Sequence, residues 1–371
     1  MAYVFHAPRE IITGRGCLAS LGEKAKPLGR HALLVTGRHA AKAAGFTDRA
    51  TQLLGESGVA VTLFDGVQPE PTVHNVDDGR SLVAEHACDL VIGLGGGSAI
   101  DAAKAIAGLA RETGATEEFL DGRLKVTKRA LPMIAVPTTA GTGAEATPNA
   151  VLTDPERTLK QSLRASSMLP DVAIVDPELT LPCPPKLTAY AGMDALVQAI
   201  ESYLSIRATP LTEGLSLHAA RLLLRSLERA VKDGRHLPAR EDCAYASLMA
   251  GIALANARLG AVHGLAHPLG VRYGIPHGLT CAVLLPPVLR MNRPFAVEKF
   301  AALDALAGGE IIASVEKLMA AVGVPLDLRE YHLRAEDFKQ MADESLPSGS
   351  TQANPKKMTS ADFVALLDAV K

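Results

Sequence analysis

Two hydrophobic patterns divide this chain, and the change between them near residues 179–188 limits the folds that it can adopt. Before that point, short apolar runs alternate with stretches of helical periodicity, a pattern typical of strands and helices in turn. Strands connected through helices run parallel, with right-handed crossovers, so this half predicts a doubly wound parallel α/β sheet. The predicted strands cover residues 31–37, 59–67, 89–97, 131–139 and 170–179, and the predicted helices cover 46–58, 76–88 and 98–110.

Helical spacing dominates the rest of the chain. Apolar residues recur at this spacing over residues 194–204, 214–231 and 244–260, and strand signals nearly vanish. We therefore predict an α/β domain over residues 1–182 and an all-helical domain over residues 183–371. The polar stretch 345–360 is interpreted as a surface loop before a last short helix.

Composition excludes several classes of partner. The 371 residues carry a formal net charge of -2, so we expect neither a nucleic-acid nor a membrane partner, because both require a basic face. The five cysteines are scattered without a Cys-x-x-Cys pair, which favours reduced thiols in the cytoplasm over disulfides. No signal peptide and no membrane-spanning run is visible.

Two glycine-rich loops follow predicted strands. The first is Gly95–Ser98, before a helix whose first turn is expected to hold Asp101; free N–H groups at such a helix start bind phosphate. The second, residues 137–147, adds several hydroxyl groups at another carboxyl end of the sheet. Together they predict an extended ligand such as a dinucleotide, although neither has the G-x-G-x-x-G spacing.

A group of histidines and carboxylates stands in the helical half. Asp194, Gln198 and Glu201 fall on one face of a predicted helix, at i, i+4 and i+7. Farther along the chain come His263, His267 and His277, with Pro268 expected to end or kink the helix at His267. Imidazoles with a carboxylate form a ligand set for Fe(II) or Zn(II), so a metal site is favoured over a group of core histidines.

Five motifs in this order resemble the iron-containing alcohol dehydrogenases: GGGSAIDAAK, PTTAGTGAEAT, DPELT, GMDAL followed by IESY, and His-x-x-x-His followed by Pro-His-Gly. The resemblance covers essentially the whole chain. It implies a dinucleotide-binding α/β domain, a helical domain, and a cleft between them for cofactor, metal and substrate. The cofactor residues that it implies are Gly96, Gly97, Ser98, Thr138, Thr139, Thr142, Thr147, Lys160 and Leu179.

The same resemblance implies Asp194, His263 and His277 as metal ligands and His267 as the histidine of the proton relay. The chain departs from the family at Gln198, where most members have a fourth, histidine ligand. An amide oxygen is a poorer ligand for Fe(II) or Zn(II) than imidazole. Three hypotheses follow: Gln198 or water completes the shell, the metal binds weakly, or the enzyme works without metal. The retained Asp194 favours a metal.

The choice of nicotinamide is predicted from the end of the first strand. Members that prefer NAD tend to have an Asp there, which holds the ribose 2′-hydroxyl, whereas this chain has Gly37 followed by Arg38. An absent carboxylate and an adjacent guanidinium suit a 2′-phosphate. We therefore expect NADP, with NAD as the second choice.

The resulting hypothesis is a cytoplasmic alcohol dehydrogenase, or aldehyde or ketone reductase, that uses NAD(P) and metal-assisted hydride transfer. A metal-independent, maleylacetate-type oxo-acid reductase is one alternative, with Arg164 or Arg272 holding substrate carboxylates. A lyase or polyol-phosphate dehydrogenase of the wider superfamily is a weaker alternative. A third alternative is a cofactor-binding protein without catalysis. An expected apolar strand at residues 3–5, paired across a two-fold axis, favours a homodimer or larger homo-oligomer.

Overall fold

The computed structural model describes residues 3–157 and 159–371, which form two compact units. The α/β unit contains Ala7–Thr139 and Gly143–Pro182, and the helical unit contains Cys183–Lys371. Two short segments that the sequence placed in the first domain, residues 3–6 and Ala140–Thr142, group with the helical unit. Backbone and side-chain hydrogen bonds between His6 and Asn256 hold the first of them, which no local pattern reveals.

The α/β unit is built on a six-stranded sheet, and all of its strand pairs are parallel, as predicted. The strand order is β1-β8-β5-β4-β2-β3, with a separate antiparallel hairpin of β6 and β7. The strands are β1 (Glu10–Thr13), β2 (His31–Gly37), β3 (Ala60–Val67), β4 (Leu90–Gly95), β5 (Met133–Pro137), β6 (Asn149–Asp154), β7 (Leu159–Arg164) and β8 (Val172–Val175).

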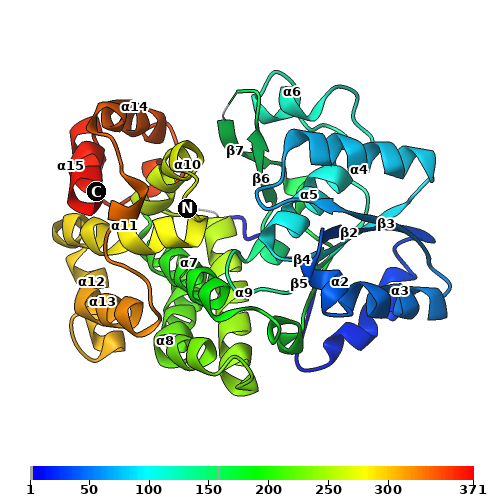
Figure 1. Cartoon of the computed structure of the whole chain (residues 1–371), viewed down its shortest axis with the longest axis horizontal. Coiled ribbons are helices and arrows are strands. Elements are labelled where there is room, and N and C mark those ends of the chain that lie inside the picture. Colours follow the sequence, from blue (N-terminus) through cyan, green and yellow to red (C-terminus); the bar gives the residue numbers. More distant parts are fainter. Residues whose placement is uncertain (1–2, 158) are drawn as a thin grey trace. The chain divides into compact units, whose positions relative to one another are not determined.

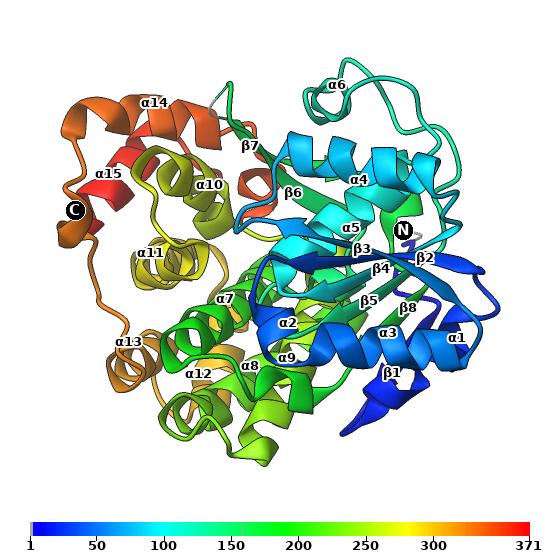
Figure 2. The same cartoon turned by 45° about the vertical axis from the view of Figure 1, so that its right-hand side comes forward.

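Helices cover both faces of this sheet (Figure 2). Successive side chains of β2 alternate between two apolar clusters: Leu33 and Val35 join one, and Ala32 and Leu34 join the other. All four side chains are fully buried, which explains why the strand has no polar face. The helices of this unit are α1 (Leu21–Ala25), α2 (Ala40–Ala43), α3 (Phe46–Glu56), α4 (Val73–Glu85), α5 (Gly97–Leu109) and α6 (Thr116–Leu120).

Three strands were not predicted, and the strand expected at residues 3–5, which would pair with a second copy of the chain, stays a prediction. The short β1 is stabilised by its distant partner β8, and the hairpin β6–β7 has too few apolar residues in β7 to be recognised as strand. Residues 3–5 form no strand within the chain, and Tyr3 and Val4 are exposed. Apolar character alone does not make a strand where no neighbouring backbone is available for pairing.

The second unit consists of helices and short 3-10 turns around one apolar core (Figure 1). Among the described residues, no single helix is long and apolar enough to cross a membrane; α9 and α10 reach that size only as a pair bent by 103°. The helices are α7 (Pro185–Leu204), α8 (Pro210–Lys232), α9 (Leu237–Ala257), α10 (Ala261–Tyr273), α11 (His277–Asn292), α12 (Val297–Ala307), α13 (Ile311–Ala321), α14 (Ala335–Ser345) and α15 (Ser360–Val370).

Candidate active site

The first glycine-rich loop joins β4 to α5 with the geometry of an anion site. Gly95 has φ 157°, a backbone conformation that side chains rarely adopt, and Gly96 is the extended N-cap residue of α5. No side chain caps the N–H groups of the first turn. Those groups and the positive end of the helix dipole are therefore available to a phosphate.

An ion pair and a hydrogen bond at Glu70 lie beside this loop, and they involve two predicted cofactor residues, Lys160 and Ser98. The backbone N–H of Glu70 donates to the hydroxyl of Ser98 (3.2 Å), and the Glu70 carboxylate accepts from Lys160 Nζ (2.5 Å). Glu70 itself has φ 59°, uncommon for a residue with a side chain. Lys160, on β7, is thereby held next to the start of α5.

The second loop is tied to α5 through a buried lysine that the sequence did not single out. Lys104 is fully buried, and its ammonium contacts the hydroxyl of Thr147 (2.9 Å), the carbonyl of Asn149 and the carboxylate of Asp101 (2.8 Å). The prediction that Asp101 lies in the first turn was wrong, because α5 begins at Gly97. Asp101 accepts instead from the N–H of Val151 (3.0 Å) and anchors β6.

The remaining predicted cofactor residues are spread over both units. Thr138 and Thr139 follow β5 and are half-buried, and the N–H of Thr138 donates to the carbonyl of Gly95 (2.9 Å). Thr142 is exposed and belongs to the helical unit. Leu179 is 4% exposed and packs in the apolar core below the sheet.

Gly37 and Arg38 stand at the carboxyl end of β2, two strands from β5 in the sheet. The exposed Arg38 guanidinium donates to the carbonyl of Gly66 (3.3 Å), which holds it beside the end of β3. A Cβ at Gly37 would meet the carbonyl oxygen of Val67 at 3.7 Å, an ordinary contact. The position therefore has room for a side chain, although it carries none.

In the helical unit, four side chains from three helices converge. Asp194 comes from α7, His263 from α10, and His277 and Cys281 from α11, and their ligand atoms all lie within 4.8 Å of one another. Asp194 Oδ1 lies 3.2 Å from His263 Nε2 and 3.7 Å from His277 Nε2. Sequence patterns indicated the first three of these residues and missed Cys281, although it stands at i+4 from His277 on one helix face.

Glu201 and Gln198, also on α7, orient this cluster. Glu201 accepts from His263 Nδ1 (2.6 Å) and from the backbone N–H of Val262 (2.7 Å). With Nδ1 protonated towards Glu201, the Nε2 atom of His263 presents its lone pair to the cluster. Gln198 Nε2 donates to Asp194 Oδ2 (3.1 Å), which leaves Oδ1 directed at the imidazoles.

The electrostatics of the cluster favour positive charge. Burial alone would raise the pKa of Asp194, but His277 and His263 outweigh burial and hold this pKa below its usual range. Burial alone would lower the pKa of His263, but Cys281, Asp194 and Glu201 hold it well above its usual range. Burial raises the pKa of Cys281 to about 11. A buried place that stabilises a cation in this way suits a divalent metal.

Of the end or kink expected beside Pro268, the end does not occur. Helix α10 continues through Pro268 to Tyr273, with the hydrogen bond to the carbonyl of Gly264 missing. Leu265 and Leu269 on either side are completely buried, so tertiary packing outweighs the local preference. The ring of His267 lies 5.7 Å from that of His277, next to the cluster.

A glycine allows α7 and α11 to approach closely enough for the cluster to form. A Cβ at Gly278 would lie 2.2 Å from the carbonyl oxygen of Tyr190, closer than any real contact. Only glycine fits there, one residue after His277, so the backbone of α11 contacts that of α7. This contact brings His277 to Asp194.

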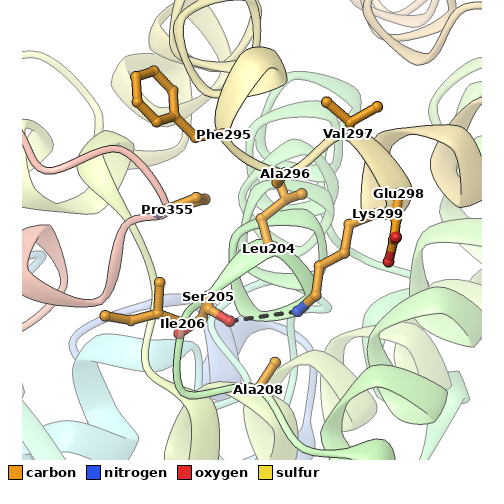
Figure 3. Close-up of a pocket in the computed structure, with 10 residues that line it drawn as sticks. All are labelled: Leu204, Ser205, Ile206, Ala208, Phe295, Ala296, Val297, Glu298, Lys299 and Pro355. Atoms are coloured by element: carbon orange, nitrogen blue, oxygen red, sulfur yellow. Dashed lines mark hydrogen bonds between the residues drawn. The ribbon is translucent and has the colours of Figure 1, made fainter.

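The helical unit also has a surface pocket, which none of the four clustered side chains lines. It has a volume of about 480 Å³ and is lined by the end of α7, the start of α12 and Pro355 (Figure 3). Its Lys299 donates to the backbone carbonyls of Tyr203 (2.7 Å) and Ser205 (3.5 Å). It contains none of the clustered ligands, so we do not assign chemistry to it.

Comparison with known protein families decides the meaning of this arrangement. The model described as "Iron-containing alcohol dehydrogenase" matches residues 8–177, and the one described as "Fe-containing alcohol dehydrogenase family, C-terminal" matches residues 188–370. The chain is also 40% identical over 368 residues to 1,3-propanediol dehydrogenase of Klebsiella pneumoniae, covering 95% of each protein. The chain belongs to the iron-containing alcohol dehydrogenase family.

Other members of the family share its full length and its fold. A crystal structure of 1,3-propanediol oxidoreductase superposes with a TM-score of 0.96 at 37% identity and covers 100% of both chains. The NAD-dependent methanol dehydrogenase of Bacillus methanolicus is 33% identical, over 98% of each protein. The NADPH-dependent butanol dehydrogenase of Clostridium saccharobutylicum is 34% identical, over 99% of this chain and 97% of its own.

Membership of the iron-containing alcohol dehydrogenases makes this chain an oxidoreductase acting on CH–OH groups and implies NAD(P) and a divalent metal. The residues present fit both. The start of α5 offers uncapped N–H groups to a phosphate, and the buried cluster offers imidazole and carboxylate ligands to a metal. Gln198 Oε1 is also buried and has no hydrogen-bond partner among the described residues.

Proposed function

We propose that this protein is an NADP-preferring alcohol dehydrogenase that reduces small aldehydes or ketones with the help of a divalent metal. The observation that carries the proposal is the buried cluster of Asp194, His263 and His277, whose ligand atoms converge and whose charges favour a cation. A metal-free reductase would have no need to bury Asp194 and Glu201 around one histidine.

Bound metal would polarise the substrate oxygen as a Lewis acid, and the reduced nicotinamide would supply the hydride. The protein contributes orientation and proton transfer. Glu201 fixes the tautomer of His263, and Gln198 fixes the carboxylate of Asp194. His267, beside His277, is the group that gives a proton to the oxygen when an aldehyde is reduced.

The cofactor is held through the α/β unit in this proposal. The start of α5 binds the pyrophosphate with Gly96, Gly97 and Ser98, and Lys160 lies beside it through Glu70. Arg38 at the end of β2 pairs with the 2′-phosphate of NADP. A homodimer remains our expectation for the assembly.

The metal-independent oxo-acid reductase is supported less well. Of the two arginines expected to hold substrate carboxylates, Arg272 already pairs with Glu344 (3.3 Å) at the end of α10. Arg164 lies at the end of β7, in the other unit. No pair of convergent cations is therefore formed by these two residues within either unit.

A chelation experiment tests the proposed function. Protein stripped with a chelator should lose NADPH oxidation with a panel of short aldehydes, and Fe(II) or Zn(II) added under anaerobic conditions should restore it. Dependence on metal is expected because the developing alkoxide needs charge stabilisation. Full turnover by protein shown to be metal-free would instead support the metal-independent reductase, and no turnover in any state would support a cofactor-binding protein.

The preference for NADP is tested by Gly37→Asp. A Cβ at Gly37 makes only an ordinary contact. The Asp carboxylate would repel a 2′-phosphate and accept from a ribose 2′-hydroxyl. We expect kcat/KM for NADPH to fall by roughly 10–100-fold relative to NADH, the worth of one charge-assisted contact. The ratio of the two cofactors within one protein preparation controls for folding. An unchanged ratio would contradict the assignment of Gly37 and Arg38.

A further inference from the structure

Cys281 stands inside the metal cluster in a way that a core cysteine would not require. Its Sγ lies 3.7 Å from His263 Nε2 and 3.6 Å from His277 Nε2, and the side chain is completely buried. Cys243, on α9 of the same unit, is also buried and packs in the same apolar core, but it belongs to no group of metal-ligand side chains among the described residues. Cys281 therefore differs from it by its neighbours, which are two imidazoles and a carboxylate.

The distances between the four ligand atoms match a tetrahedron. A metal with nitrogen and oxygen ligands at about 2.0–2.1 Å and sulfur at about 2.3 Å has ligand–ligand edges of about 3.3–3.6 Å. Four edges of the cluster measure 3.2, 3.7, 3.7 and 3.6 Å: Asp194 Oδ1 to each of His263 and His277 Nε2, and Cys281 Sγ to the same two atoms. The cluster is thus pre-arranged around one small central volume.

Gln198 faces this cluster with the wrong atom for a ligand. Its amide nitrogen donates to Asp194 Oδ2, and an amide nitrogen has no lone pair to offer a cation. Turning the amide around would place its oxygen against the carboxylate oxygen, an unfavourable contact between two acceptors. Gln198 therefore positions Asp194 through Nε2, and its Oε1, buried without a hydrogen-bond partner among the described residues, is a poorer ligand for Zn(II) than a thiolate.

We propose, on the basis of the metal-assisted function above, that Cys281 is the fourth protein ligand and that the Asp-His-His-Cys set makes this a zinc site. A thiolate is a soft ligand, so it increases the preference for Zn(II) over Fe(II) beyond that of an imidazole or an amide at the same place. The chain exchanges an imidazole on α7 for a sulfur on α11. The site keeps four protein ligands despite Gln198.

Cobalt substitution tests directly whether Cys281 coordinates the metal. The full-length protein, freed of metal and titrated with Co(II), should bind one ion per chain. It should show a thiolate-to-Co(II) charge-transfer band in the near ultraviolet. Cys281→Ser should lose that band and weaken Co(II) binding by at least about 100-fold, since even ligand-orienting residues cost 10–100-fold. Cys243→Ser is the matched control and should keep both. In an equimolar anaerobic mixture, the wild type should take up Zn(II) over Fe(II).

A second variant shows whether Cys281→Ser still folds. Gln198→His in the Cys281→Ser background supplies an imidazole from α7, and should recover Co(II) affinity without the charge-transfer band. Stoichiometric Co(II) binding by the wild type without the band overturns the proposal but leaves the metal-assisted function intact. Absence of Co(II) binding by the wild type overturns both. The wild-type spectrum therefore decides the matter even if a variant fails to fold.

Discussion

Asp194→Ala is expected to abolish metal retention and to lower kcat for aldehyde reduction by about 10³-fold or more. The carboxylate Oδ1 lies within 3.7 Å of both imidazoles, so its removal takes away the anionic ligand of the cluster. Losing a single electrostatic stabiliser of a developing oxyanion already costs about 10²–10³-fold, and the whole metal should be worth at least that much.

Metal content and single-turnover rates check this prediction on the same preparation. Cofactor affinity is the control: the phosphate-binding start of α5 lies in the other unit, so NADPH binding should stay within a few-fold of the wild type. Asp194→Asn separates charge from shape, and should also lose metal. If either variant turns over at the wild-type rate, Asp194 has a structural role and the metal-assisted mechanism fails.

Lys104→Met is expected to cost about 3–5 kcal/mol of stability, because it removes one partner of a buried ion pair. The lysine side chain is fully buried and that of Asp101 is 13% exposed, so solvent screens the pair little. Burial lowers the pKa of Lys104, and the Asp101 carboxylate opposes that shift. Methionine fills the space but removes the cation beside Asp101 Oδ1 and the donor to the carbonyl of Asn149, while the N–H of Val151 still donates to Asp101 Oδ2.

Chemical denaturation followed by circular dichroism measures this loss. Lys42→Met, at an exposed position on α2 of the same unit, should change stability by less than about 0.5 kcal/mol. Adding Asp101→Asn to Lys104→Met should recover part of the loss, since no unpaired charge then remains. KM for NADPH should rise as well, because Lys104 ties Thr147 and Asn149 to α5. A loss equal to that of Lys42→Met would refute the importance of the buried pair.

The two units differ in how much of their structure the local sequence pattern predicted. In the α/β unit, largely apolar runs became the buried strands β2, β4, β5 and β8, because strands buried on both faces need apolar residues at nearly every position. The edge strand β3 was also predicted, although most of its residues are exposed or half-buried. Of the strands that escaped prediction, β1 is stabilised by its distant partner β8, whereas β6 and β7 pair with each other as a hairpin, and β7 has too few apolar residues to be recognised. The wrong placement of Asp101 came from assigning the helix start one residue too late, because α5 begins at Gly97 and its first turn ends before Asp101.

Sequence periodicity by itself determined the parallel sheet and the change to helices near Pro182. It also determined the common face of Asp194, Gln198 and Glu201 on α7, because a spacing of 2 or 3.6 residues fixes which side chains share a surface. Only the tertiary structure decided which residues meet across helices. Gly278 allows α11 to contact α7, and that contact places Cys281 beside His263, which precedes it by 18 residues. A lone cysteine carries no periodic signal, so its role depends on packing between helices, which local spacing does not encode.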